Sequence, residues 1–255
     1  MLNGHKVIVV TPCYAPAAMF AESRRLMADK WTPGLVDEFW LLLNKYPLPS
    51  VEENEAALIE AADRFGYQVF DSGADLGLAG SLDNFFALHP QPAGTLFISV
   101  DPDSTTNDVG FDKALCEVVT AGAGIPACAL GIPQTTDREA TLIAGYRVYV
   151  HPSMMMTDIG CVDLDWHGGE FKANDKLWGG NETKLYDRLL ATGTHLGYLL
   201  DYTNAPGLRS QHDIRYAIWK WEHFYERFSG SFAEYLASPK CVDDLVGLYG
   251  KQRAV

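Results

Sequence analysis

Residues 95–103 read Thr-Leu-Phe-Ile-Ser-Val-Asp-Pro-Asp, an apolar run followed at once by two aspartates one residue apart. The run predicts a buried strand that delivers Asp101 and Asp103 to its carboxyl end. Ligands of open α/β sheets collect where the strands end, and neighbouring carboxylates bind hard divalent cations such as Mg²⁺ or Mn²⁺. The stretch therefore indicates a metal and diphosphate site, although a loop whose Asp only caps the next helix fits the same residues.

Strand and helix patterns alternate around this stretch, which is typical of a sheet with helices on both faces. Apolar runs predict strands over residues 6–11, 38–43, 67–70, 95–100, 127–130, 146–150, 161–164 and 195–200. Helical spacing predicts helices over residues 17–31, 51–65, 78–88, 110–121, 182–192 and 213–228. We expect the first strand to stop at Pro12, and we expect an α/β fold: a Rossmann-like, mostly parallel mixed sheet with a helical C-terminal tail.

The first predicted helix, over residues 17–31, carries one apolar stripe. Five of its residues fall near that stripe: Met19, Phe20, Ser23, Leu26 and Met27. Such a stripe is the face that an amphipathic helix buries.

The charge of the chain limits its partners. The net charge is −13 and the pI is about 4.8, so the protein's long-range field repels a polyanion and disfavours direct binding of duplex DNA. Four basic residues cluster around the last predicted helix, which is usually just a solvated surface: Arg209, Arg215, Lys220 and Arg227. An acidic protein that handles phosphates needs a cation, which agrees with the paired aspartates.

The 255 residues, 47% of them hydrophobic, are enough for a substantial core. No apolar run approaches the roughly 20 residues that span a bilayer, so we expect a cytoplasmic protein without a membrane span. The cysteines are odd in number and scattered, without a Cys-x-x-Cys pair, which predicts buried, reduced thiols: Cys13, Cys116, Cys128, Cys161 and Cys241.

Residues 179–193, Gly-Gly-Asn-Glu-Thr-Lys-Leu-Tyr-Asp-Arg-Leu-Leu-Ala-Thr-Gly, add a second landmark. With the upstream aspartates, they resemble the GT-A glycosyltransferases, especially the family-2-like group that uses nucleotide-diphosphate sugars. The segment is similar to that family's Gly-Gly-Glu-Asp segment, with Glu182 at the second acidic position and Leu185, Arg188 and Gly193 at the expected spacing. By itself, the segment also fits an ordinary amphipathic helix that Asn181 caps.

Two earlier stretches extend the resemblance, which covers roughly residues 5–202. Residues 75–84 look like the family's Asn-x-Gly turn and its following helix, which places Asp75, Gly77 and Asn84 near the nucleotide. Physically, Gly77 permits a positive φ, and the start of the helix offers free N–H groups to an anion. A plain left-handed turn is the alternative for this stretch.

The turn after the first strand, residues 11–14, resembles the family's nucleotide-cradling loop, which implies contacts from Thr11, Pro12 and Tyr14 to the base or ribose. Tyr14 fits simple packing equally well. After the second strand many relatives carry an Asp that holds the base or ribose, whereas this chain has Asn44, so its nucleotide preference stays open.

The resemblance also implies roles in a metal site. Asp103 is expected to coordinate Mn²⁺ or Mg²⁺ directly, and Asp101 to contact the ribose or to reach the metal through water. His212 falls where many GT-A enzymes place a histidine that completes the metal site. Glu182 is expected to take the proton of the acceptor hydroxyl, the role that the family gives to an Asp.

The resemblance implies a metal-dependent glycosyltransferase with a nucleotide-diphosphate sugar as donor, UDP-sugar favoured. We expect one domain over 1–255, with a nucleotide-sugar-binding half (1–103), an acceptor-side half (104–202) and the helical tail (203–255). A nucleotidyltransferase and a nucleotide-sugar-binding protein without turnover remain alternatives, although the first turn lacks the Gly- and Lys-rich signature of the former.

The acceptor is not named by the sequence. A small molecule, glycan or protein hydroxyl is favoured over a hydroxylated base in phage-type DNA, because the chain is acidic. We expect the acceptor pocket in the loops 135–140, 154–158 and 166–178, where Trp166, Phe171 and Trp178 offer an apolar platform for a ring or pack into the core.

Overall fold

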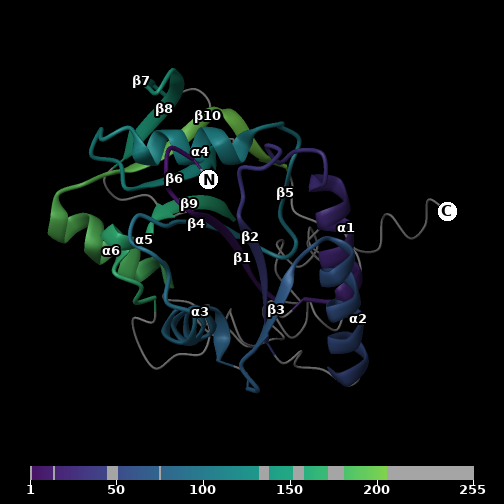
Figure 1. Cartoon of the computed structure of the whole chain (residues 1–255). Helices are drawn as coiled ribbons and strands as arrows, with labels where there is room; N and C mark the ends of the chain where they lie inside the picture. The colour runs from purple at the N-terminus through teal and green to yellow at the C-terminus, as the bar shows by residue number, and fades with distance from the viewer. Residues whose placement is uncertain are drawn as a thin grey trace, which may run out of the picture.

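The computed structural model describes residues 2–13, 15–44, 51–74, 76–131, 138–151, 158–171 and 181–205. Ten strands in these residues form one sheet (Figure 1): β1 (Val7–Cys13), β2 (Glu38–Leu43), β3 (Gln68–Asp71), β4 (Leu96–Val100), β5 (Thr105–Thr106), β6 (Ala127–Gly131), β7 (Thr141–Ile143), β8 (Tyr146–His151), β9 (Ile159–Asp163) and β10 (Leu196–Ala205). The spatial order is β3-β2-β1-β4-β9-β6-β10-β8-β7, and β5 pairs with β10. Most strands run in one direction, while β5, β8 and β9 run in the other, so the expected mostly parallel mixed sheet is confirmed.

Six helices lie in the described part of the chain: α1 (Ala17–Met27), α2 (Val51–Arg64), α3 (Gly77–Leu88), α4 (Phe111–Thr120), α5 (Leu164–His167) and α6 (Asn181–Thr192). The alternation of side chains along β1 sorts them onto two faces, because successive residues of a strand point to opposite sides. Val7 and Val9 share a core with α4, whereas Ile8 and Val10 share a core with α3 and α6. Helices α1 and α2 pack on the α4 side of the sheet, and Figure 1 shows α3 and α4 on opposite sides.

The chain reverses its direction of winding at β1. It moves outward from β1 to β2 and β3, then returns through α3 to β4 on the other side of β1. The carboxyl ends of β1 and β4 therefore flank a topological switch point, the place where open α/β sheets bind ligands. The register Val10↔Ser99 brings Asp101 level with the last residues of β1.

Strand β1 continues to Cys13, so the expected stop at Pro12 is wrong. Pro12 is in register with Leu42 of β2, but the pairing of β1 with β4 already ends at Val10↔Ser99. A proline has no backbone N–H to donate, so it is tolerated where no neighbouring strand pairs with that side of the strand.

Helix α1 ends at Met27 rather than at residue 31, and its buried stripe is shifted from the expected one. Leu26 is 36% exposed, whereas Arg24 is only 2% exposed. The chain leaves the helix after Met27 so that Trp31 packs on Phe111, with ring centroids 4.8 Å apart.

Three short elements were not expected from the sequence: β5, β7 and α5. Strand β10 also extends beyond the predicted end at residue 200, because Asn204 and Ala205 pair with Thr106 and Thr105 of β5. The predicted helix over 213–228 and the tail from 206 onward lie outside the described residues. No helix in the described ranges combines the length and apolar character needed to cross a membrane.

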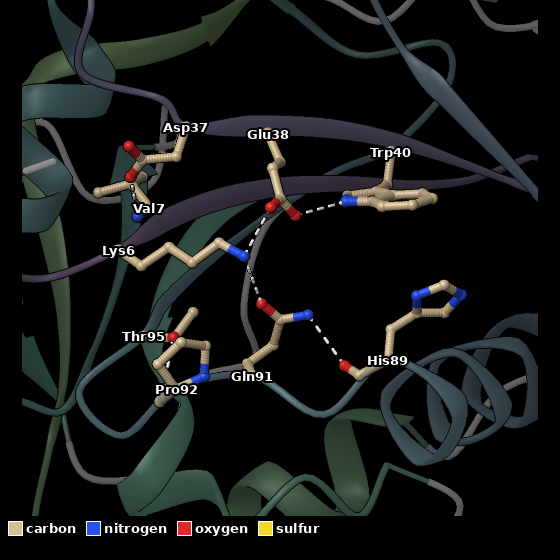
Figure 2. Close-up of polar contacts among 9 residues, drawn as sticks. All are labelled: Lys6, Val7, Asp37, Glu38, Trp40, His89, Gln91, Pro92 and Thr95. Atoms are coloured by element: carbon tan, nitrogen blue, oxygen red, sulfur yellow. Dashed lines mark hydrogen bonds and ion pairs between the residues drawn. The ribbon is translucent and has the colours of Figure 1, made fainter.

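A polar network fastens the amino-terminal ends of β1 and β2 to the loop before β4 (Figure 2). Lys6 pairs with Glu38 at 2.7 Å and donates to Gln91 Oε1 at 3.0 Å. Trp40 Nε1 donates to the other Glu38 oxygen at 2.9 Å, and Gln91 Nε2 donates to the His89 carbonyl at 2.9 Å. These residues lie at the edge of the sheet opposite Asp101, so we assign them a structural role.

We expect Glu38→Gln to lower the free energy of unfolding by less than about 1 kcal/mol near neutral pH, since Lys6 and Glu38 are partly exposed. Burial would raise the pKa of the Glu38 carboxyl, but the hydrogen bonds from Lys6 and Trp40 outweigh burial and hold this pKa below its ordinary value of 4.5. The contribution is therefore present above about pH 4.5 and is lost as the pH falls through the lowered pKa. Urea unfolding of both proteins at about pH 7 and about pH 3 is the measurement. If the free energies of unfolding of the wild type and of Glu38→Gln differ by the same amount at both pH values, the contribution is not ionic.

Candidate functional site

The carboxyl ends of β1, β2 and β4 meet at one edge of the sheet. Beyond β4 the chain makes a turn over residues 101–104, in which the Ser104 amide donates to the Asp101 carbonyl at 3.2 Å. The Asp101 amide in turn donates to the Asp158 carbonyl at 3.0 Å, next to β9. The turn therefore presents two carboxylates at the switch point: Asp101 is half-buried and Asp103 is 3% exposed.

Helix α1 holds both ends of this turn. An Arg24 Nη atom donates to the Asp101 carbonyl at 2.8 Å, and the Ser23 hydroxyl donates to the Ser104 carbonyl at 2.6 Å. The same Arg24 nitrogen also donates to Ser23 Oγ at 2.9 Å, which links the two contacts.

The Arg24 guanidinium is enclosed by oxygens and aromatic rings. Its other Nη atom donates to the Tyr67 hydroxyl at 3.0 Å and to Thr11 Oγ1 at 3.4 Å. Its Cζ atom lies 5.4 Å from the ring centroid of Phe20 and 5.9 Å from that of Tyr67, within the range of cation–π attraction. Arg24 therefore joins α1, β1 and the approach to β3 to the turn after β4.

Cys13 is the last residue of β1, and its side chain is fully buried. The pKa of its thiol is raised to about 12, chiefly by burial, with smaller effects from a backbone hydrogen bond of Ala15 and from Arg24, which lower it, and from Asp103, which raises it. A thiol in this state is not a nucleophile at neutral pH. Cys13 is therefore a buried structural residue at the end of β1.

Asn44, directly after β2, is fully buried at the same edge. Its amide N–H donates to the Cys13 carbonyl at 2.9 Å, and its Oδ1 accepts a short hydrogen bond from the Ser81 hydroxyl of α3. Its Nδ2 makes no hydrogen bond within the described part of the chain. A buried amide N–H without an acceptor is costly, so Nδ2 is a candidate donor to a ligand.

The predicted nucleotide residues fall partly at this edge. Thr11 and Pro12 lie on β1, and the fully buried Thr11 hydroxyl faces Arg24. Gly77 is the first residue of α3 and has φ +66°, as the sequence predicted, and Asn84 is a half-buried residue of the same helix. The register of β1 with β4 thus brings Thr11 and Pro12 level with the residues just after β4, and Gly77 and Asn84 lie on the helix that also carries Ser81.

Four other predicted residues are described incompletely or not at all. The backbone of Glu182 lies in the first turn of α6, while Tyr14, Asp75 and His212 lie outside the described residues. Within the described ranges, no group of three or more His, Cys, Asp or Glu side chains is arranged to hold a metal ion. Among the described residues, Asp101 and Asp103 are the candidate ligands of a cation at this edge.

Two of the three aromatic residues proposed for an acceptor platform lie within the described part of the chain, and both pack against the core. Phe171 is 5% exposed and stacks on His167, with ring centroids 4.2 Å apart, so it is a core residue. Trp166 is half-buried against the same core, and its carbonyl accepts a hydrogen bond from Arg188 Nε of α6 at 2.7 Å. Trp178 lies outside the described residues.

Arg24 and Ser81 were not predicted from the sequence, and Asn44 was predicted only as a departure from the family pattern. One signal was present for Arg24: it lies four residues after Phe20 and three before Met27, which are both buried on α1. Ser81 follows Gly77 by four residues and lies on the buried side of α3.

Comparison with solved structures identifies the fold. The mannosyltransferase PcManGT from Pyrobaculum calidifontis, in complex with GDP-Man and Mn²⁺, is similar over 91% of this chain and 64% of its own, with a TM-score of 0.57 and 12% identity. GalNAc-T7 with UDP, GalNAc and Mn²⁺ is similar over 94% of this chain and 52% of its own, with a TM-score of 0.58 and 12% identity. S. aureus TarS 1-349 is similar over 78% of this chain and 59% of its own, with a TM-score of 0.53 and 13% identity.

The fold is therefore the GT-A fold that the sequence predicted, and this chain spans between 52% and 64% of the length of these three solved chains. Neither the protein-family models nor the curated protein sequences contain a match to this sequence.

Proposed function

We propose that this protein is a metal-dependent glycosyltransferase that moves a sugar from a nucleotide-diphosphate sugar to an acceptor hydroxyl. One observation carries the proposal: Asp101 and Asp103 lie in a buried turn at the carboxyl end of β4, at the switch point of a GT-A fold. Two of the similar proteins are described with a nucleotide or nucleotide sugar and Mn²⁺ bound, which supports the same chemistry here.

The donor set at this turn fits Mn²⁺ or Mg²⁺. Both cations prefer oxygen ligands, and Mg²⁺ in particular is commonly held by one or two carboxylates together with substrate phosphates and water. Asp103, supported by Asp101, would hold the cation, and His212 is the proposed third protein ligand. When bound, the cation would supply positive charge that stabilises the leaving nucleoside diphosphate.

Asn44 and the loop after β1 form the proposed nucleoside pocket. The buried Nδ2 of Asn44 lacks an acceptor in the described structure, and Ser81 fixes the orientation of its side chain. A carbonyl of the base or a ribose oxygen would satisfy this N–H. Tyr14 and Asp75 are further residues of the proposed pocket, and UDP-sugar is the favoured donor.

The proposed acceptor is a small molecule, a glycan or a protein hydroxyl, and Glu182 is the proposed base. The net charge of −13 disfavours a polyanionic acceptor such as duplex DNA, because the field of the whole protein opposes its approach. Glycosylation of a hydroxylated DNA base is the alternative acceptor reaction.

The test is binding and turnover of UDP- and GDP-sugars with Mn²⁺, Mg²⁺ or EDTA. We expect calorimetry to show tight donor binding only with a divalent cation, and we expect slow release of nucleoside diphosphate that an acceptor accelerates. Equal affinity in EDTA would contradict the metal site. Pyrophosphate release from a nucleoside triphosphate would favour a nucleotidyltransferase, and metal-dependent binding without release would favour a binding protein. Micromolar duplex DNA binding that weakens steeply with salt would favour the DNA acceptor.

A further inference from the structure

The turn that carries the two aspartates is held from α1 by two neighbouring side chains. Ser23 binds the carbonyl at one end of the turn, on Ser104, and Arg24 binds the carbonyl at the other end, on Asp101. The Ser23–Arg24 contact of 2.9 Å couples the two side chains. The conformation of residues 101–104 therefore depends on α1 as well as on the strand that precedes it.

Arg24 is an unusual choice for a residue that only fills the core. Burying a guanidinium is costly, and within the described residues Arg24 forms no ion pair that would offset the cost. Its hydrogen-bond acceptors are neutral oxygens, one of them the Asp101 carbonyl and three of them the hydroxyls of Thr11, Ser23 and Tyr67. An apolar residue of similar volume would stabilise a core at least as well, so the charge and the fork geometry of Arg24 call for another explanation.

The turn provides that explanation. The planar fork of Arg24 reaches the Asp101 carbonyl and Ser23 Oγ through one Nη atom, and Tyr67 and Thr11 through the other. Ser23 in turn donates to the Ser104 carbonyl at 2.6 Å. The pair therefore links both ends of the turn to β1 and to the residue before β3.

We propose that Ser23 and Arg24 are positioning residues that hold the turn at residues 101–104 in the geometry that receives the cation and the diphosphate. This proposal rests on the proposed function and names residues that support its metal site without contacting the ligand. It assigns Arg24 a role that lysine cannot fill, since an ammonium lacks the planar fork that reaches the Asp101 carbonyl, Ser23 and Tyr67 together.

The experiment compares Arg24→Lys and Ser23→Ala with two controls. Arg25→Lys makes the same chemical change on the adjacent, exposed residue, which pairs only with Glu22 among the described residues. Asp112→Ala removes a buried carboxylate of α4 that accepts hydrogen bonds from Thr32 at 2.8–3.1 Å, outside the turn and eight residues after Ser104. The second control supplies a variant that is destabilised while Ser23 and Arg24 keep their contacts to the turn.

Two quantities are measured for each protein: the affinity for Mn²⁺ together with UDP, by calorimetry, and the exchange rate of the Ser104 amide hydrogen. We expect Arg24→Lys to weaken Mn²⁺–UDP binding about tenfold or more and Ser23→Ala several-fold, with faster Ser104 exchange in both, since a hydrogen bond to a charged group carries a large share of local order. Arg25→Lys and Asp112→Ala are expected to bind Mn²⁺–UDP as the wild type does.

Two results would overturn the proposal while leaving the proposed function intact. One is wild-type affinity for Mn²⁺–UDP in Arg24→Lys and Ser23→Ala despite faster Ser104 exchange, which would mean that the turn needs no positioning. The other is an equal loss of affinity in Asp112→Ala, which would make Arg24 an ordinary contributor to stability. If the wild type binds neither UDP nor GDP in the presence of Mn²⁺, the proposed function fails and this inference fails with it.

Discussion

An Asp103→Asn variant is expected to lose about 10³-fold in turnover, because it removes a charge from the residue proposed to hold the cation. The carboxamide has nearly the same shape as the carboxylate, and Asp103 is 3% exposed, so the turn keeps its packing while its negative charge is lost. The measurement is steady-state release of nucleoside diphosphate at saturating donor and Mn²⁺, accompanied by thermal unfolding of each variant.

Asp163→Asn is the matched control for this variant. Asp163 ends β9, pairs in register with Leu96 at the opposite end of β4, and caps α5 through bonds to the amides of Asp165 and Trp166. Asparagine caps a helix about as well as aspartate, so the control removes one charge from the same sheet without disturbing the site. Full activity in Asp103→Asn, or an equal loss in Asp163→Asn, would contradict the metal assignment.

Asp101→Asn distinguishes the two carboxylates. Asp101 is the more exposed of the pair, and its main chain is held by both Arg24 and the Asp158 carbonyl. A larger loss in Asp101→Asn than in Asp103→Asn would reverse the expected order of direct coordination.

The parallel half of the sheet was predictable because its strands are apolar runs set between helical patterns. The predicted strand over 38–43 has the bounds of β2, and the residues before Asp101 form β4 as expected. The partners of each strand were not predictable in the same way. Strand β9 lies antiparallel between β4 and β6. Its sequence is a short apolar run, which predicts a buried strand but not the direction in which the strand runs. Strand β5 is two residues long, which is too short for any periodicity.

Some residues of the candidate site were predictable from the sequence and others were not. Asp101 and Asp103 were predicted because a polar pair directly after a buried strand has a defined place at the edge of a sheet. Arg24 was not predicted, because a charged residue on a helix is mostly exposed and nothing local marks an exception. Its burial depends on acceptors far along the chain, the Tyr67 hydroxyl and the Asp101 carbonyl, which only the fold brings to α1.

The position of Glu182 follows from the direction of α6. A short connection through Gly193, which has φ +62°, joins the end of α6 to the start of β10, and β10 runs parallel to β6. Leu185 and Leu189 bury the helix on the α3 side of the sheet. Since the helix ends where β10 begins, its first turn lies toward the other edge of the sheet, the edge at which Asp101 follows β4.

We therefore expect Glu182→Gln to lower turnover by between about 10²-fold and 10⁴-fold, since the residue is proposed to take the proton of the acceptor. The affinity for the nucleotide sugar should change little, because Glu182 is not proposed to bind the diphosphate. Asp187→Asn, an exposed acidic position on the same helix, is the matched control and should keep full activity. Steady-state kinetics with saturating donor and varied acceptor separate the two effects. Near-normal turnover in Glu182→Gln would leave this residue only the role of a first-turn acid that stabilises α6 through the helix dipole, and would favour a retaining reaction, which needs no such base.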